Sequence, residues 1–336
     1  MKSDMTPKER YDSVLSGKQP DIAPRIPILM QFAAEYIGSN YGSFASDHKV
    51  LVESNIRCAE DFGMDQLSCI SDPYRETAGF GAEIKFHENF VPECVRPPLA
   101  DTDDLSILTI PDPEVAVRMR DRLDAVRLFV GKDNGQHSVM GWVEGPGALS
   151  ADLRGLEDFY MDLIEEPEWC EELLDISTEA STRFATAQLK AGADTIGIGD
   201  AMCSQISTAT YESLILPRQK KLVKAIHDAG GIVRLHICGQ TEHLWNGIAA
   251  LNVDIFDCDA MVSMERARQR LGPKVVLAGN LNPVDDLRFG NPEAIREGVS
   301  QCLSDSGKPF MICAGCEVPS GTPEENLRAL CAPVQV

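Results

Sequence analysis

The sequence lacks the features that would point to a membrane or a nucleic acid. No apolar run approaches the roughly 20 residues that span a membrane, and residues 1–15 contain no hydrophobic signal core. Basic residues are scarce, 31 Lys and Arg against 52 Asp and Glu, and this formal charge of −21 leaves no clustered basic face for phosphates. We therefore expect a cytoplasmic protein that binds neither nucleic acid nor a membrane.

The chain also has no linker, no low-complexity tract and no glycine-rich nucleotide fingerprint. A chain of 336 residues can form a single large α/β domain, so we predict one domain over residues 1–336. Cysteine, in contrast, is plentiful at 11 residues. In a reducing compartment such thiols stay free, and those with a function are ligands or nucleophiles rather than bridges.

Short apolar runs alternate with segments of helical periodicity. We predict eight strands, at Arg25–Phe32, Asp65–Ile70, Ser138–Val143, Thr195–Gly199, Gly231–Cys238, Val253–Asp257, Lys274–Gly279 and Pro309–Cys313. We predict helices at Asp47–Phe62, Pro113–Phe129, Leu156–Ala191, Tyr211–Ala229 and Pro292–Ser304. Eight β/α units without a nucleotide fingerprint favour a closed (β/α)₈ TIM barrel of the α/β class.

Two helix starts and one insertion are also marked in the sequence. Thr6-Pro7-Lys8-Glu9 and Thr322-Pro323-Glu324-Glu325 each predict a threonine N-cap with proline at the first helical position. The first of these opens an N-terminal helix before the barrel, and the second opens the last barrel helix. Alternation within Gly79–Val95 predicts a hairpin inserted after the second strand.

The fifth predicted strand carries a pair of metal-binding residue types, His236 and Cys238. Side chains two apart on a strand share a face, so both point the same way at the strand's C-terminal end, where barrel active sites lie. The eighth predicted strand leads into Cys316 at the same rim. We therefore consider these three residues as candidate zinc ligands.

One imidazole and two thiolates suit a catalytic zinc ion that keeps one position vacant. Two thiolates cancel the charge of Zn²⁺, which makes the metal a poor activator of water but leaves it able to hold an incoming thiol as a thiolate. The pattern thus favours activation of sulfur over hydrolysis.

Other interpretations of these cysteines stay open at this point. Buried cysteines are common as apolar residues, and Cys313 could replace Cys316 as the third ligand. Cys313 and Cys316 also form a C-x-x-C sequence, which is typical of redox sites but normally opens a helix near the first βα unit.

At these residues the sequence resembles the uroporphyrinogen decarboxylase superfamily, and within it the branch of cobalamin-dependent methyltransferases. The specific motifs are His236-x-Cys238-Gly239 and Ala314-Gly315-Cys316-Glu317-Val318-Pro319 followed by Gly321-Thr322-Pro323. The resemblance extends over nearly the whole chain, through Lys8-Glu9-Arg10, Leu15–Lys18, Pro24–Pro27, Glu144–Gly147, Gly192–Asp194 and Gly279–Pro283.

The resemblance implies a uroporphyrinogen-decarboxylase-like barrel with zinc on His236, Cys238 and Cys316. It implies a methyltransferase that moves a methyl group between a methylated corrinoid and a small acceptor, which we expect to be a thiol. The chain has no D-x-H-x-x-G type cobalamin-binding sequence, so the corrinoid would arrive on a partner protein. Two alternatives are demethylation of a small substrate, such as a methoxylated aromatic or a methylamine, onto the corrinoid, and a non-enzymatic docking module.

Several further residues lie at or just after the ends of predicted strands. We expect Asp72, Glu144 and Asp200 to act in catalysis and Asn280 to contact the cofactor, because strand ends build barrel active sites. Glu317 could occupy the vacant zinc position until the substrate arrives.

A porphyrinogen decarboxylase is a weaker interpretation. Asp72 falls near the catalytic aspartate of that enzyme. The arginine-rich motif that binds porphyrinogen carboxylates is missing, however, since the matching stretch, Met30–Tyr36, contains no arginine and includes Glu35.

Overall fold

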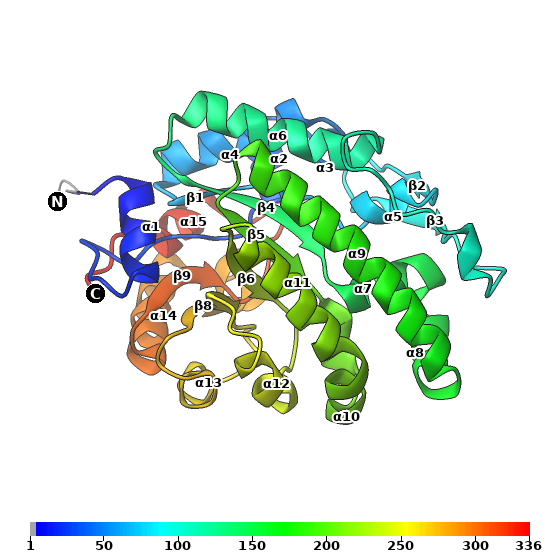
Figure 1. Cartoon of the computed structure of the whole chain (residues 1–336). Helices are drawn as coiled ribbons and strands as arrows, with labels where there is room; N and C mark the ends of the chain where they lie inside the picture. The colour runs from blue at the N-terminus through cyan, green and yellow to red at the C-terminus, as the bar shows by residue number, and fades with distance from the viewer. Residues whose placement is uncertain (1–4) are drawn as a thin grey trace.

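The computed structural model describes residues 5–336, which form a curled parallel sheet surrounded by helices (Figure 1). The seven strands pair in the order β1-β4-β5-β6-β7-β8-β9. Their bounds are β1 Gln66–Ser68, β4 Ser138–Glu144, β5 Thr195–Gly199, β6 Ile232–His236, β7 Ile255–Asp257, β8 Val276–Leu281 and β9 Phe310–Ala314. All of these pairings are parallel, so the strands' C-terminal ends meet at one end of the barrel.

The first predicted strand, Arg25–Phe32, is wrong in detail. Its residues make two isolated bridges, from Arg25 to Ile312 and from Leu29 to Val318, and Phe32 already lies in a helix. The Arg25 carbonyl accepts a hydrogen bond from the Asp65 backbone N–H, so the segment still occupies the gap between β9 and β1. Pro24 and Pro27 have no N–H to donate, which interrupts the ladder that a regular strand would make.

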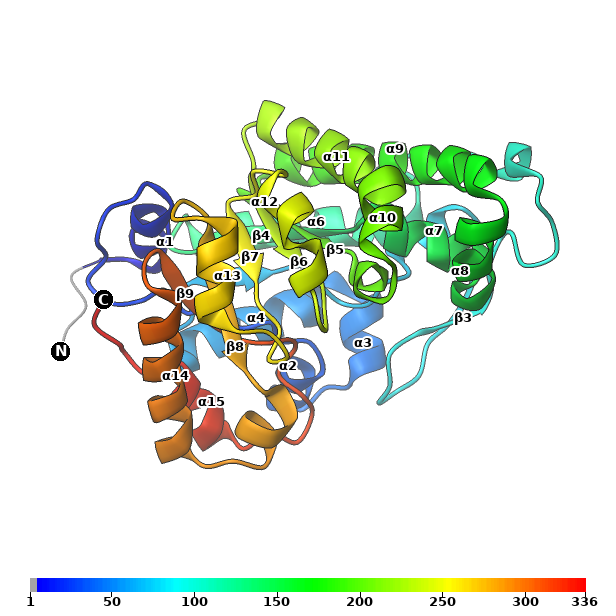
Figure 2. The same ribbon diagram turned by 90° about the horizontal axis from the view of Figure 1, so that it is seen from below.

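Helices cover the outer face of the sheet (Figures 1 and 2). The α-helices are α1 Pro7–Leu15, α2 Gln31–Tyr36, α3 Tyr41–Ser46, α4 His48–Phe62, α5 Arg75–Gly79, α6 Val117–Asp133, α7 Pro146–Arg154, α8 Leu156–Glu165, α9 Pro167–Ala191, α10 Thr208–Thr210, α11 Leu216–Asp228, α12 Trp245–Ala249, α13 Met264–Leu271, α14 Pro292–Ser306 and α15 Glu324–Leu330. Short 3₁₀ turns lie at Leu105–Ile107, Ala201–Gln205 and Glu242–Leu244, and π-helical turns at Tyr211–Ile215 and Pro283–Arg288.

Two helix predictions needed correction. The single helix expected over Leu156–Ala191 is two helices, α8 and α9, because Pro167 cannot continue α8 and instead begins α9. The threonine cap expected at Thr322 is also wrong. Helix α15 begins one residue later, with Pro323 as its N-cap, and the Thr322 hydroxyl donates to the Pro319 carbonyl.

The other two local predictions are confirmed. Thr6 caps α1 in a full capping box with Glu9. The predicted hairpin is present as the antiparallel pair β2 (Glu83–Lys85) and β3 (Glu93–Arg96), inserted between β1 and α6.

The core has two layers, which follow from alternation along the strands. On β9, Phe310, Ile312 and Ala314 face the helices, whereas Met311 and Cys313 face the barrel interior. Helix α1 closes the end of the barrel where the strands begin. Its residue Tyr11 packs into the interior cluster, and the Tyr11 hydroxyl lies 2.9 Å from Oγ1 of Thr195, the first residue of β5. The opposite end of the barrel, where the strands finish, is therefore open for a functional site. Across residues 5–336, no helix has both the length and the apolar character required to cross a membrane.

Candidate metal centre

Strand β6 directs polar side chains into the barrel interior. Val233 and Leu235 pack in the outer layer of the core, so the alternate residues, Arg234 and His236, point inward. Cys238 follows two residues after His236, just beyond the end of the strand. Because they are two residues apart, the side chains of His236 and Cys238 both point to the inside of the barrel at the end of β6.

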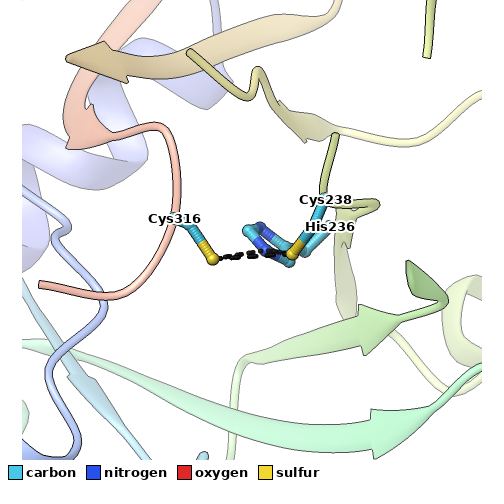
Figure 3. Close-up of side chains that lie close together, drawn as sticks. All are labelled: His236, Cys238 and Cys316. Carbon is cyan, nitrogen blue, oxygen red and sulfur yellow. Dashed lines mark hydrogen bonds between the residues drawn. The ribbon is translucent and has the colours of Figure 1, made fainter. Parts of the chain in front are cut away.

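Cys316 reaches this space from the loop after β9 (Figure 3). The Nε2 atom of His236 lies 2.9 Å from Sγ of Cys238 and 3.6 Å from Sγ of Cys316, and the two sulfur atoms are 3.5 Å apart. The structure thus brings together three of the residues that the sequence singled out, although Cys238 and Cys316 lie 78 residues apart in the chain.

The donor set and its dimensions fit a zinc ion. Zinc binds imidazole nitrogen at about 2.0–2.1 Å and thiolate sulfur at about 2.3 Å, so ligand atoms on a tetrahedral ion lie roughly 3.6 to 3.8 Å apart. The separation of 3.6 Å between Nε2 of His236 and Sγ of Cys316 falls in that range. The two separations that involve Sγ of Cys238 are shorter, 3.5 Å to Sγ of Cys316 and 2.9 Å to Nε2 of His236.

The imidazole of His236 is held from behind by a carboxylate. Its Nδ1 lies 3.0 Å from Oδ2 of Asp257, the residue next to it in register on β7. Asp257 is held in turn by Arg234, whose Nε donates to both of its carboxylate oxygens at 2.9 and 3.0 Å. This contact leaves Nε2 of His236 free to face the two thiols, as a metal ligand requires.

The three side chains shift one another's pKa values. The hydrogen bond with Cys238 is the main cause that lowers the pKa of Cys316, to about 4, and the same bond raises the pKa of Cys238. Burial opposes protonation of His236, but its contacts with Cys238, Asp257 and Cys316 outweigh burial and raise its pKa. The centre therefore holds a thiolate at neutral pH, which is the form of cysteine that binds metals.

A pocket of about 170 Å³ opens beside these side chains. Most of its wall is apolar, formed by Ile28, Met30, Ile70, Pro73, Trp142 and Ala201. The acidic residues on its wall are Asp72, Glu144 and Glu317. Such a pocket, with a few convergent polar groups, is the usual form of a small-molecule site.

Arginines behind the wall hold two of the acids. Arg118 donates from Nη1 and Nη2 to the two carboxylate oxygens of Asp72, at 2.8 and 2.6 Å. Burial alone would raise the pKa of Asp72, but the charges of Arg118 and Arg75 outweigh it and lower that pKa to about 2. Glu144 accepts from Arg75 at 2.6 Å, yet burial dominates there and raises the pKa of Glu144 to about 8.

The structure does not bring Asp200 and Asn280 into this pocket. The carboxylate of Asp200 is fully buried and accepts from the Ala148 backbone N–H at 2.7 Å and from Gln219 at 2.8 Å. The amide of Asn280 donates to the carbonyls of Asp259 and Val262 at 3.0 and 2.8 Å. Asp200 thus holds the first turn of α7 and the helix α11, and Asn280 holds the loop after β7, while neither lines the pocket.

Two further candidates have other partners. Cys313 is buried inside the barrel and accepts from Arg234 at 3.4 Å, and burial raises its pKa to about 11. Glu317 lines the pocket but accepts from the backbone N–H of Gln31 at 3.2 Å, and burial raises its pKa to about 7.

The sequence alone did not single out Asp257, Arg75 and Arg118. Asp257 had a signal, because it is a polar residue at the end of a predicted strand, like the residues that were chosen. Arg75 and Arg118 lie on helices α5 and α6, where charged residues are common, and nothing in the sequence marks them as buried.

Comparisons with known proteins identify the family and the fold. The family model described as uroporphyrinogen decarboxylase (URO-D) matches residues 6–335. The methylcobamide:CoM methyltransferase MtbA of Methanosarcina mazei is 27% identical over 338 residues, covering 98% of this chain and 97% of its own. The uroporphyrinogen decarboxylase of Synechocystis sp. is 27% identical over 345 residues, covering 96% of each chain. A solved structure of a methyltransferase from Methanosarcina mazei superposes with a TM-score of 0.90 at 23% identity, over 98% of both chains, and so shares the fold.

Proposed function

Because the chain belongs to the uroporphyrinogen decarboxylase (URO-D) family, we propose that it is a zinc-dependent methyltransferase of that family. A corrinoid protein would present the methyl group, and a small acceptor, a thiol, would take it. The observation that carries this proposal is the convergence of His236, Cys238 and Cys316 beside a pocket. Relatives named methylcobamide:CoM methyltransferases support it, since they match nearly the whole chain.

The three side chains would hold zinc and leave one ligand position facing the pocket. Bound zinc would supply a site where the acceptor's sulfur is kept as a thiolate, its nucleophilic form. Asp257 would fix the orientation and tautomer of His236, because its carboxylate bonds Nδ1. The apolar wall around Trp142 and Ile70 would exclude water from the reacting sulfur.

The other polar residues that the sequence singled out would position the acceptor and the elements around the metal centre. Glu144 lines the pocket and would orient the acceptor, and Asp72, whose carboxylate is paired with Arg118, would hold the wall beside it. Asp200 and Asn280 would act indirectly, Asp200 by holding helices α7 and α11 and Asn280 by holding the loop after β7. The corrinoid would come on a partner protein, because the chain carries no cobalamin-binding motif of its own. Free cysteines throughout the described chain are compatible with a cytoplasmic protein.

The test is metal analysis of the purified protein, followed by methyl transfer from free methylcobalamin to simple thiols. We expect one zinc per chain, methylated thiol as product, loss of activity with a chelator and recovery with added zinc. Failure to find zinc, or activity that a chelator leaves untouched, would overturn the proposal.

The reverse reaction, in which a small methylated compound gives its methyl group to the corrinoid, uses the same metal site. Consumption of methylcobalamin that depends on the added thiol favours the proposed direction. If thiols have no effect, while a methoxylated aromatic or a methylamine methylates the reduced corrinoid, the direction is reversed.

Porphyrinogen decarboxylation is disfavoured by the pocket. A porphyrinogen with eight carboxylates needs free guanidinium groups, and bidentate pairs with arginine are the usual solution. Arg118 is already engaged by Asp72, and the pocket volume of about 170 Å³ suits a much smaller molecule.

A further inference from the structure

The pocket beside the metal centre carries acidic groups without matching free cations. Asp72, Glu144 and Glu317 lie on its wall, and among residues 5–336 no lysine or arginine lines it. His236 is the one basic side chain there, and it belongs to the metal centre. An anionic group in the pocket would therefore meet no free positive side chain.

The two nearby guanidinium groups are not available to a ligand. Arg118 uses Nη1 and Nη2 in its bidentate pair with Asp72, and Nη2 also donates to the Ala45 carbonyl. Arg75 is fully buried, donates from Nη2 to Glu144 and from Nη1 to the Asp72 carbonyl, and lies behind the wall. Each guanidinium group is thus already paired with a carboxyl group of the protein, and neither lines the pocket.

Additional carboxyl groups lie behind the same wall. Glu76 is buried and Asp152 half-buried, and each has one buried carboxyl oxygen without a hydrogen-bond partner. Burial, together with the charge of Glu144, raises the pKa of Asp152 well above its usual range. A region that already disfavours its own negative charges would disfavour another one brought by a ligand.

Glu144 is the acid best placed to meet the acceptor. Its Oε1 accepts from Arg75 and Trp142. Its Oε2 lies beside Gly199, another residue of the pocket wall, at 3.3 Å from a Cβ added there.

We infer that the acceptor is a small neutral or cationic alkyl thiol, without a sulfonate, carboxylate or phosphate close to its sulfur. This inference rests on the proposed function and names the substrate class of the same site. It separates this chain from the relatives named for coenzyme M, because coenzyme M carries a sulfonate two carbons from its thiol. A hydroxyl or an ammonium group at that position would instead meet an acceptor for its hydrogens on Glu144.

The experiment compares three thiols that differ only in one end, HS–CH₂–CH₂–X with X a hydroxyl, an ammonium or a sulfonate. Each is titrated into Co²⁺-substituted protein, and binding is followed by the growth of the thiolate-to-cobalt charge-transfer absorption, which needs no turnover. Dissociation constants are compared after correction for the thiolate fraction of each thiol. We expect the hydroxyl and ammonium thiols to bind at least about tenfold more tightly than the sulfonate.

The outcomes separate this inference from the function on which it rests. Equal or tighter binding of the sulfonate thiol would overturn the inference and leave the thiol methyltransferase standing. If the protein binds cobalt and none of the thiols produces the absorption, the proposed function itself fails.

A variant tests whether the wall causes the discrimination. Because burial raises the pKa of Glu144 to about 8, the variant is compared with the wild type at pH 9, where Glu144 is ionised. Glu144→Gln removes that charge, so the ratio of the sulfonate and hydroxyl dissociation constants should fall several-fold. Glu212→Gln, at an exposed glutamate outside the pocket, is the matched control and should keep the wild-type ratio. A ratio unchanged by Glu144→Gln would contradict the assignment, and the wild-type comparison stands even if that variant fails to fold.

Discussion

Nδ1 of His236 lies 3.0 Å from Oδ2 of Asp257, so a carboxylate holds the back of the imidazole whose front faces two thiols. The two residues are neighbours in register on β6 and β7. A carboxylate in this position fixes the ring's tautomer and strengthens it as a ligand. The contact therefore predicts how zinc binding changes when Asp257 is replaced and the three ligands are kept.

Asp257→Asn should weaken zinc binding by about 10- to 100-fold while leaving the three ligands in place. The asparagine keeps the shape but loses the charge that the imidazole and Arg234 both contact. Competition with a chromophoric chelator measures the affinity, and circular dichroism checks the fold. The control is Asp254→Asn, since Asp254 bonds the Val233 backbone and His227 away from the site. Equal zinc affinity in both variants would refute this role of Asp257.

Cys316→Ala should abolish both stoichiometric zinc and methyl transfer, because it removes a sulfur 3.6 Å from Nε2 of His236. Cys313→Ala is the matched control, three residues earlier. Its sulfur contacts Arg234 inside the barrel, so this variant should keep zinc. Zinc content by elemental analysis decides between them, and zinc lost from Cys313→Ala but kept by Cys316→Ala would reverse the assignment of the third ligand.

Asp72→Asn should destabilise the protein by about 2 kcal/mol at neutral pH, because its pKa falls from 3.8 to about 2 on folding. With a folded pKa below the unfolded one, ionised Asp72 stabilises the fold above about pH 4, and this contribution is lost as the pH falls toward 2. Urea unfolding at pH 7, 5 and 3 should show a constant gap to wild type at the two higher values and a smaller gap at pH 3. Asp228→Asn, at an exposed ion pair with Lys224, should change stability by less than about 0.5 kcal/mol. A gap that widens on acidification would contradict the account.

Gly197→Ala should lower the free energy of unfolding by about 1 to 3 kcal/mol, since the added Cβ would overlap the ring of Trp142 inside the barrel. Trp142 lies 6.1 Å from the His236 ring, between centroids, so repacking would also reach the site. Gly131→Ala is the control. Nothing lies within 4 Å of a Cβ there, near the end of α6, and we expect no loss and a gain of up to about 1 kcal/mol. Equal effects of the two substitutions on urea unfolding would show that the packing is looser than described.

Much of the fold could be predicted because the alternation of strands and helices is strong and local. The spacing of His236 and Cys238 predicts that they point the same way, and the structure places Nε2 and Sγ of the two side chains 2.9 Å apart. Their binding of zinc stays a prediction. The break at Pro167 and the interrupted ladder at Pro24 and Pro27 could also have been anticipated, since proline removes a backbone donor.

The rest depends on contacts between distant segments, which the sequence does not display. Arg118 pairs with Asp72 across 46 residues, and Arg75 reaches Glu144 across 69. Asp200 follows a strand end just as Glu144 ends one, yet its carboxylate is turned toward Ala148 and Gln219 instead of the pocket. The position at a strand end identifies the candidate residues. The packing around each side chain decides which of them line the pocket.

The most direct test of the central claim is X-ray absorption at the zinc K-edge of the purified protein, recorded without and with a neutral thiol. The account predicts a first shell with one imidazole nitrogen at about 2.0–2.1 Å and two sulfurs at about 2.3 Å, and a third sulfur at that distance once the thiol is added. A shell of oxygen and nitrogen alone, or a sulfur count that the thiol leaves unchanged, would contradict it.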